Sequence, residues 1–311
     1  MSEFQPARLS AHRVETGESR LFRTLTGCSL ALLAVAVWSG WMVITRVAVT
    51  STLTAEDLAA LRFGFAGILL LPVVWRRGFA LDRVGWRGLL VMVLGAGVPY
   101  VLLASHGLKL ATAAEAGVLI PGTIPLFVAL ISVVTLHETI GQVARLGLAL
   151  ITAGVVLIVT PALLDAAGWQ LAGYGVCMVS SVLWAAYTIQ ARRIGLDALH
   201  ATAIITVISA ALFLPIYALL AGEGLRAASW SEIVVQLVYQ GPLTGIVALL
   251  VYTRAIALLG ATRTAAFTAL LPLTTLVLGI LVLGEWPSLG DRAGAVLAAV
   301  GVLLATAFGR R

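Results

Sequence analysis

The chain has 311 residues, of which 60% are hydrophobic and 11% are charged, and its net charge is +6. Soluble domains carry about 25% charged residues, so the composition excludes a soluble globular protein and predicts an all-α polytopic membrane protein. The basic residues lie between apolar segments, so we interpret them as determinants of membrane topology. They do not form the continuous basic surface that would indicate nucleic-acid binding.

Ten apolar segments are each long enough to cross a bilayer, which takes about 20 residues, and only short connections separate them. A polar segment, 1–23, precedes them. It carries four arginines and lacks the apolar core and cleavage site of a signal peptide, so we predict a disordered cytoplasmic tail. The predicted spans are 25–46, 58–75, 87–108, 113–136, 143–162, 171–191, 199–221, 232–253, 264–284 and 291–308.

The arginines and the single lysine among the spans predict their orientation. With the amino terminus in the cytoplasm, fifteen basic residues lie on the cytoplasmic side. The five that lie outside are Arg46, Arg62, Lys109, Arg226 and Arg292. Basic residues accumulate on the cytoplasmic side of membrane proteins, so both termini are predicted to be cytoplasmic.

The second half of the chain repeats the first. Five residues recur in type at an offset of 147, and Trp38 with Arg46 recurs at an offset of 146 as Trp184 with Arg192. The five are Pro125, Glu138, Arg145, Gly147 and Gly154, which recur as Pro272, Glu285, Arg292, Gly294 and Gly301. Five spans in each half make the second half enter the membrane from the opposite face. We therefore predict two inverted five-helix repeats, 24–163 and 164–311.

Pro125 and Pro272 lie near the middle of the fourth and ninth predicted spans. A proline inside a helix frees a backbone carbonyl and bends the helix, which is tolerated beside a cavity. Because the feature recurs in both halves, we predict that these prolines form hinges or cavity walls. A packing kink without a functional role is the alternative.

Aromatic and neutral polar side chains within the spans are the candidate ligand-binding groups. An indole in the middle of a bilayer needs a partner for its N–H, which favours a wet cavity. Uncharged hydroxyl and amide groups suit polar ligands. The alternatives are aromatic packing between helices and, for each hydroxyl, a bond to its own helix. The candidates are Trp38, Trp41, Tyr100, Ser105, His106, Trp184, Tyr187, Tyr239, Gln240 and Thr244.

Charged residues are absent from the centres of the predicted spans. His106 and Glu115 are the most deeply placed titratable residues, and they are candidates either for ion coupling or for helix capping. The other acids are scattered at helix ends, and Cys28 and Cys177 lie far apart in the sequence. This pattern predicts no metal site and no cofactor. It disfavours an intramembrane enzyme, which needs clustered acids or histidines, and a purely structural subunit is equally disfavoured.

Gly147 with Gly154, and Gly294 with Gly301, place small residues on one face of the fifth and tenth predicted spans. Small residues let membrane helices approach closely, so these spans are predicted to form a scaffold and not a cavity wall. An oligomer interface is the alternative, so the sequence leaves both a monomer and an oligomer open.

Short motifs in both halves are typical of one group of membrane proteins. In the first half they are Ala60-Leu61-Arg62-Phe63, Ala111-Thr112-Ala113-Ala114-Glu115-Ala116, Thr123-Ile124-Pro125-Leu126-Phe127 and Leu136-His137-Glu138. In the second half they are Gly260-Ala261-Thr262-Arg263, Pro272 and Leu283-Gly284-Glu285. Over about 25–308 the chain resembles the drug/metabolite transporter superfamily, in its ten-helix EamA-type branch.

The resemblance implies a bacterial inner-membrane exporter of small molecules that works by alternating access. It implies a central cavity lined by the first, third, fourth, sixth, eighth and ninth spans, with the fifth and tenth at the periphery. The chain looks most like the bacterial exporters of aromatic and other amino acids. Because no charge lies at the centre of a span, we expect broad selectivity and facilitative transport. The alternative cargo is drugs, nucleobases or other small metabolites, with proton coupling. The first span holds Trp38 and no carboxylate, which argues against organic-cation antiport of the kind seen in four-helix relatives.

Overall fold

The computed structural model describes residues 17–165, 167–220 and 223–307. Within these residues every regular element is helical, and ten helical segments are long and apolar enough to cross a membrane, which confirms the predicted all-α fold. The ten are Leu21–Val49, Ala55–Arg77, Leu81–Leu110, Ala113–Leu136, Gln142–Leu164, Gly168–Ile194, Ala198–Leu219, Trp230–Leu259, Arg263–Leu283 and Leu289–Thr306.

The first helix starts earlier than the sequence predicts. Helix α1 (Gly17–Val49) begins inside the polar segment, so residues 17–23 of the predicted tail are helical. The rest of that tail, 1–16, lies outside the described residues. The polar start of α1 therefore extends the helix beyond the apolar stretch that the hydropathy pattern detects.

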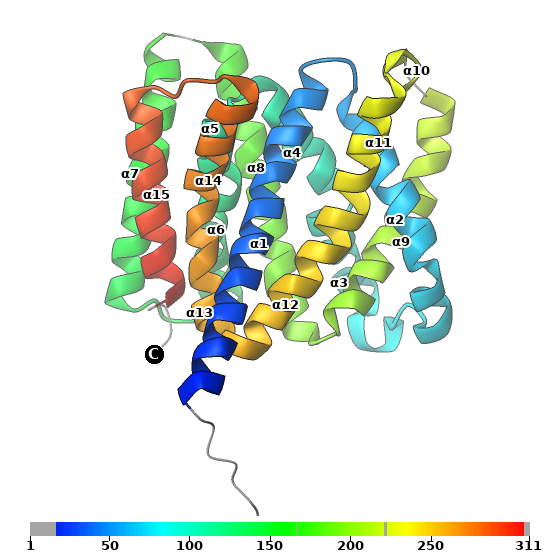
Figure 1. Ribbon diagram of the computed structural model, residues 1–311, viewed down its shortest axis with the longest axis horizontal. Helices are drawn as coiled ribbons and strands as arrows, with labels where there is room; N and C mark the ends of the chain where they lie inside the picture. Colours follow the sequence, from blue (N-terminus) through cyan, green and yellow to red (C-terminus); the bar gives the residue numbers. More distant parts are fainter. Residues whose placement is uncertain (1–16, 166, 221–222, 308–311) are drawn as a thin grey trace, which may run out of the picture.

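The two halves run in opposite directions. Helix α1 begins at the face of the bundle where α15 (Leu289–Ala307) ends, here called the terminal face (Figure 1). The first helix of the second half, α8 (Gly168–Ile194), begins at the opposite face. The odd number of spans in the first half produces this inversion.

Four spans are interrupted, and they occupy matching places in the two halves. The third span breaks at Gly97 between α3 (Leu81–Ala96) and α4 (Val98–Leu110). The fourth, eighth and ninth contain π-helical or 3₁₀ turns at or next to Pro121, Pro242 and Pro272. The pieces are α5 (Ala113–Gly117), η1 (Val118–Gly122), α6 (Ile124–Leu136), α11 (Trp230–Val238), η2 (Tyr239–Val247), α12 (Ala248–Leu259), α13 (Ala261–Phe267), η3 (Thr268–Leu270), α14 (Leu271–Leu278) and η4 (Gly279–Leu283). Broken helices in matching positions of two repeats mark a binding site near the middle of a transporter fold.

Three helices that begin at the opposite face, α2 (Ala55–Arg77), α5 and α11, carry a capping box. Helix α2 begins after Thr54. The hydroxyl of Thr54 accepts a hydrogen bond from the backbone N–H of Asp57, and the carboxylate of Asp57 accepts one from the backbone N–H of Thr54. Such a capping box satisfies N–H groups that have no partner within the helix. Asp57 also accepts the hydroxyl of Tyr217 at 2.5 Å, which ties α2 to α9 (Ala198–Leu220). The short α10 (Glu223–Ala227) follows α9 at this face.

Helices α7 (Gln142–Leu164) and α15 pack closely through the predicted glycines. A methyl group on Gly147 would lie 2.6 Å from the carbonyl oxygen of Gly301, and one on Gly154 would lie 2.7 Å from that of Gly294. Only hydrogen fits in such a space, so the repeated glycines allow the two backbones to touch. This contact gives the predicted scaffold its structural basis.

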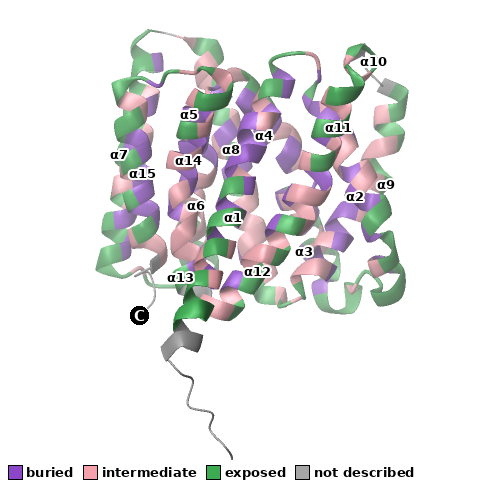
Figure 2. Ribbon diagram, viewed as in Figure 1, coloured by how far each residue is buried: buried purple, intermediate pink, exposed green. Residues whose placement is uncertain are grey.

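The outward surface of the bundle is apolar. Figure 2 shows exposed residues on the outer sides of the helices and buried residues between them. Five tryptophans are 64–85% exposed near helix ends, namely Trp75, Trp86, Trp169, Trp230 and Trp286. Ten apolar spans with such a surface belong to a multi-pass membrane protein.

Candidate functional site

A cavity of about 630 Å³ lies between the two halves. Its mouth is at the terminal face, where it is lined by residues beyond the end of α6, such as Glu138, and by Arg192 near the end of α8. None of the described residues in the connections at the opposite face lines it. The cavity is therefore accessible from the terminal face and ends inside the bundle. Its volume falls in the range of small-molecule sites, about 300–1,000 Å³.

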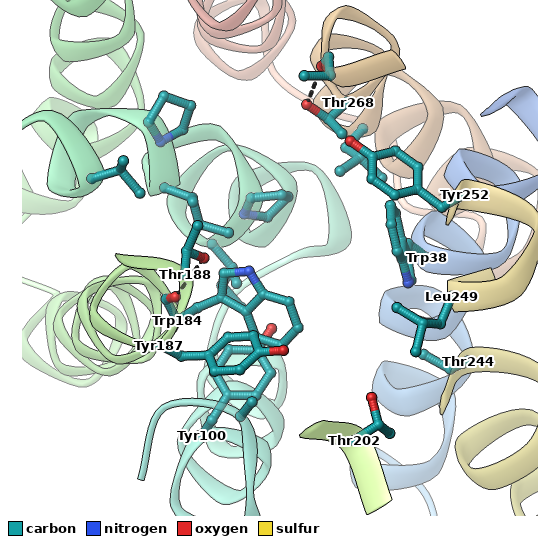
Figure 3. A pocket seen from close by; sticks show the side chains of 18 of the residues that line it. Trp38, Tyr100, Trp184, Tyr187, Thr188, Thr202, Thr244, Leu249, Tyr252 and Thr268 are labelled. Carbon is teal, nitrogen blue, oxygen red and sulfur yellow. Dashed lines mark hydrogen bonds between the residues drawn. The ribbon is translucent and has the colours of Figure 1, made fainter. Parts of the chain in front are cut away.

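Eight of the predicted site residues line this cavity. They come from both halves, and the tryptophans and tyrosines form two facing walls (Figure 3). The eight are Trp38, Trp41, Tyr100, Pro125, Trp184, Tyr187, Gln240 and Thr244.

Four predicted site residues lie elsewhere. His106 is exposed, with its Nε2 3.1 Å from Glu56 Oε1. Ser105 is buried, and its hydroxyl has no hydrogen-bond partner among the described residues. Tyr239 packs on α1 at Gly40, where a methyl group would lie 1.9 Å from the tyrosine oxygen. Pro272 is buried, and its side chain faces Gly122. Pro272 therefore does not line this cavity, whereas Pro125 does. A hinge role for the two prolines stays a prediction.

Aromatic rings form a continuous row along one wall. Trp41 stacks on Tyr100 with ring centroids 6.4 Å apart, and Tyr100 lies 4.8 Å from Trp184. Trp184 in turn meets Tyr187 edge to face at 5.3 Å. Across the cavity, Trp38 packs on Tyr252 at 5.0 Å. These rings offer broad apolar surfaces to a ligand between them.

Trp41 is fixed by a buried hydrogen-bond network. Its indole N–H donates to Gln240 Oε1 at 2.6 Å. The amide of Gln240 donates to Thr45 at 2.9 Å and to Gln236 at 3.1 Å, and Gln236 donates to the carbonyl of Ile44. The network joins α1 of the first half to α11 and η2 of the second. It holds one end of the aromatic row in place.

Five aromatic polar groups of the cavity have no partner among the described residues. Within the described part of the chain, no hydrogen bond is formed by the indole nitrogens of Trp38 and Trp184 or by the hydroxyls of Tyr100, Tyr187 and Tyr252. These groups face the space between the walls (Figure 3). They are available to water or to a ligand.

Arg62 lies inside a span and lines the cavity, although the topology count assigns it to the outer side. It lies about 10 Å along α2 from the first residue of that helix and lines the cavity. Its guanidinium carbon is 5.7 Å from the ring centroid of Trp41 and 5.9 Å from that of Phe63. The topology count assigns Arg62 to the outer side of the predicted span 58–75, and in the structure it lies among the aromatic rings. A charged residue within an apolar span is the sequence signal that identifies it.

Glu115 is a structural residue at the opposite face. Its carboxylate accepts the backbone N–H of Thr112, the hydroxyl of Tyr174 and the amide of Gln170. The capping alternative therefore describes Glu115, which does not line the cavity.

Two ion pairs stand at opposite ends of the molecule. At the opposite face, Arg46 pairs with Glu285 and also donates to the carbonyls of Leu108 and Ala111. The second oxygen of Glu285 accepts the N–H of Ala113 at 2.8 Å. At the terminal face, a single contact of 3.9 Å joins Arg192 Nη2 to Glu138 Oε1.

More spans contribute to the cavity than the family resemblance implies. The second and seventh spans line it as well, with Arg62, Phe63, Thr202 and Thr206 among their residues. Helices α7 and α15, expected to be peripheral, also reach its mouth at Ala144, Leu148, Ala305 and Thr306. In the described ranges no group of three or more His, Cys, Asp or Glu residues could hold a metal ion.

Comparisons with known proteins agree with this architecture. The sequence model of the EamA-like transporter family matches this chain twice, over residues 25–160 and over residues 171–307. The comparison with curated protein sequences gives no match. A solved structure described as "Crystal structure of protein" is similar over 94% of this chain and 100% of its own, with 24% identity and a TM-score of 0.58. At that identity the likeness supports the fold alone.

Proposed function

The chain belongs to the EamA-like transporter family, and we propose that it exports amino acids, aromatic ones among them, across the bacterial inner membrane by alternating access. The observation that carries the proposal is the cavity between the repeats, which has aromatic walls and unpaired hydrogen-bonding groups. Aromatic surfaces suit an apolar side chain, and the free indole and hydroxyl groups suit a polar backbone end. The cavity is broad enough to support wide selectivity among such substrates.

The distribution of charge supports the direction of transport. The basic residues accumulate at the terminal face, so that face is the cytoplasmic one in our proposal. The cavity opens at this face and is closed at the other. The conformation is then inward-open, and an exporter in this state can load substrate from the cytoplasm.

The two ion pairs support alternating access. Arg46 and Arg192 occupy matching positions of the repeats, and so do Glu285 and Glu138. The closed end thus has a tight pair, and the open end has a loose pair of the same residue types. If the two halves of an inverted repeat exchange conformations, the closed end opens and the open end closes. The tight pair then becomes loose and the loose pair becomes tight. We propose that Arg192 and Glu138 close the cytoplasmic end when Arg46 and Glu285 separate.

The titratable groups of the cavity support facilitative transport. Among the described lining residues, Glu138 is the one carboxylate, no histidine is present, and Glu138 lies at the mouth beside Arg192. His106 and Glu115 are outside the cavity. A proton-coupled carrier needs a group that binds the proton in contact with the substrate pathway. We therefore propose that the substrate gradient alone drives export.

Reconstituted protein tests this function. Proteoliposomes take up radiolabelled phenylalanine, tryptophan and leucine faster than protein-free liposomes, and a pH gradient does not change the initial rate. Absence of uptake for every amino acid contradicts the proposed substrates, and uptake of labelled nucleobases or drugs by the same proteoliposomes then identifies the alternative cargo. Uptake that requires the pH gradient contradicts facilitative transport.

A further inference from the structure

Arg62 is the one cavity-lining cation of the described chain that lies away from the mouth. Its guanidinium has no hydrogen bond and no ion pair within the described residues, and its contacts are the rings of Trp41 and Phe63. By contrast, Arg46, Arg77 and Arg192 each have a carboxylate partner. The position of Arg62 is therefore not explained by a structural ion pair.

An unpaired cation within a membrane span is costly, so such residues face a wet cavity and mark the site of a ligand. The ring contacts leave the five N–H donors of the guanidinium without hydrogen-bond acceptors. A guanidinium with free donors matches a carboxylate, which it binds with two parallel hydrogen bonds. The rings of Trp41 and Phe63 attract the guanidinium, which lines the cavity.

The surroundings of Arg62 define the rest of the ligand. Trp41 is held by Gln240 and begins the row of rings that continues through Tyr100 to Trp184. A substituent on a carboxylate bound at Arg62 would lie along these rings. No described carboxylate lines the inner part of the cavity, since Glu138 stands at the mouth with Arg192. The inner cavity thus has a partner for a carboxylate and no anionic partner for an ammonium group.

We propose that Arg62 binds the carboxylate of the substrate, and that the transporter accepts monocarboxylates with an apolar or aromatic substituent whether or not they carry an α-amino group. The aromatic amino acids are one kind of such substrate. This inference rests on the proposed function, because it names the group that holds the substrate in the same cavity. It predicts that the carboxylate is required for binding and that the amine is dispensable.

A ligand series on the purified wild-type protein tests this without a mutation. Phenylalanine and 3-phenylpropionate share the carboxylate, whereas 2-phenylethylamine and phenylalaninol lack it. Calorimetric titration in detergent should detect binding of the first two and a dissociation constant roughly tenfold to hundredfold weaker for the last two. Equal binding of 2-phenylethylamine and 3-phenylpropionate overturns the proposal. Phenylphosphonate is included because the guanidinium also suits a phosphonate, and its preference over every carboxylate overturns the assigned ligand class.

Variants of Arg62 then assign the effect to this side chain. Arg62→Gln should weaken binding of 3-phenylpropionate by roughly tenfold to hundredfold. Arg62→Lys should weaken it less, because lysine keeps the positive charge. Arg76→Gln removes an exposed arginine at the other end of the same helix and should bind as wild type does. Thermal unfolding confirms that each variant is folded. Unchanged binding by folded Arg62→Gln protein overturns the role of Arg62.

The outcomes separate this inference from the proposed function. If proteoliposomes take up amino acids and Arg62→Gln transports them at the wild-type rate, the carboxylate site is wrong and the amino acid exporter stands. If no amino acid is taken up but 3-phenylpropionate binds through Arg62, the carboxylate site stands and the proposed substrates are wrong.

Discussion

Arg46 pairs with Glu285 across the two repeats at the closed end of the cavity. The pair is largely buried, with side-chain exposures of 14% and 22%, and its charges are further bound to backbone groups of the α4–α5 region. Its counterpart in the other repeat, Arg192 with Glu138, is 45% and 49% exposed at the open end. The same residue types thus form a tight contact where the molecule is closed and a loose one where it is open.

Loss of the buried pair should both destabilise the protein and slow transport. Arg46→Ala leaves Glu285 without its cation, and removing one partner of a buried pair costs about 3–5 kcal/mol. Thermal unfolding should therefore begin at a lower temperature, and initial uptake should fall about tenfold, the effect of about 1.4 kcal/mol on the equilibrium between the two states.

Two further variants control this result. Lys109→Ala removes an exposed positive charge from the same face and should behave as wild type does. The double exchange Arg46→Glu with Glu285→Arg should recover part of the stability and uptake lost in Arg46→Ala. A double variant no better than the single one would show that the pair itself does not close this end.

Removal of the exposed pair should have a different signature. Glu138→Gln and Arg192→Ala should slow uptake, because the terminal face closes less favourably, and should leave the unfolding temperature unchanged. A half-exposed contact at 3.9 Å contributes about 0–1 kcal/mol to stability. Ligand binding to the open state should also be unchanged, as measured by calorimetry. Wild-type uptake in both variants contradicts the role of this pair in closure.

The tryptophans of the cavity should separate into two groups. Trp38→Ala and Trp184→Ala should reduce uptake with little change in folded yield, because their indole nitrogens form no hydrogen bond with any described residue. Trp41→Phe should lower stability by about 1–3 kcal/mol, because it leaves Gln240 Oε1 without its donor. Chemical unfolding in detergent and uptake measured on the same preparations check both expectations. The grouping is refuted if Trp38→Ala and Trp184→Ala lower stability while the remaining folded protein transports normally.

The glycine contact between α7 and α15 should tolerate no side chain. Gly154→Ala places a methyl group 2.7 Å from the carbonyl oxygen of Gly294, so the helices must move apart. The expected loss of stability is about 1–3 kcal/mol, as for other overpacked sites. Gly175→Ala is the matched control, since nothing lies within 4 Å of its added methyl group. Equal unfolding temperatures for the two variants would contradict the close packing.

The sequence was sufficient for the spans and for the duplication, because apolar length and recurring residue types are properties of the chain itself. It was less informative about which side of each helix faces the cavity. Ser105 and His106 follow Tyr100 by five and six residues, which turns them about 140° and 240° away around an ideal helix. If Tyr100 faces the cavity, helical periodicity therefore turns Ser105 and His106 away from it, and neither of them lines the cavity.

Other features depend on contacts between helices. Pro272 and Pro125 are equivalent in sequence, yet Pro272 packs against Gly122 while Pro125 lines the cavity. In any one conformation of an inverted repeat, equivalent residues have different surroundings. The symmetry of the sequence therefore does not predict which of the two prolines lines the cavity. Arg62, which lies within the predicted span 58–75, was counted only among the outer basic residues because a charge near a helix end fits topology as well as function. The contact of its guanidinium with the ring of Trp41 depends on how α1 and α2 pack, which the sequence pattern does not show.

The most direct test of the account is the side from which a residue in the cavity can be reached. Thr188 lines the cavity on α8, and a Thr188→Cys protein with Cys28 and Cys177 replaced by alanine carries a single thiol. In oriented vesicles, a membrane-impermeant maleimide should label it from the terminal face and not from the opposite face. Adding phenylalanine, or the Arg46→Ala change, should allow labelling from the opposite face. Labelling that is equal from both faces and unaffected by either change would contradict alternating access.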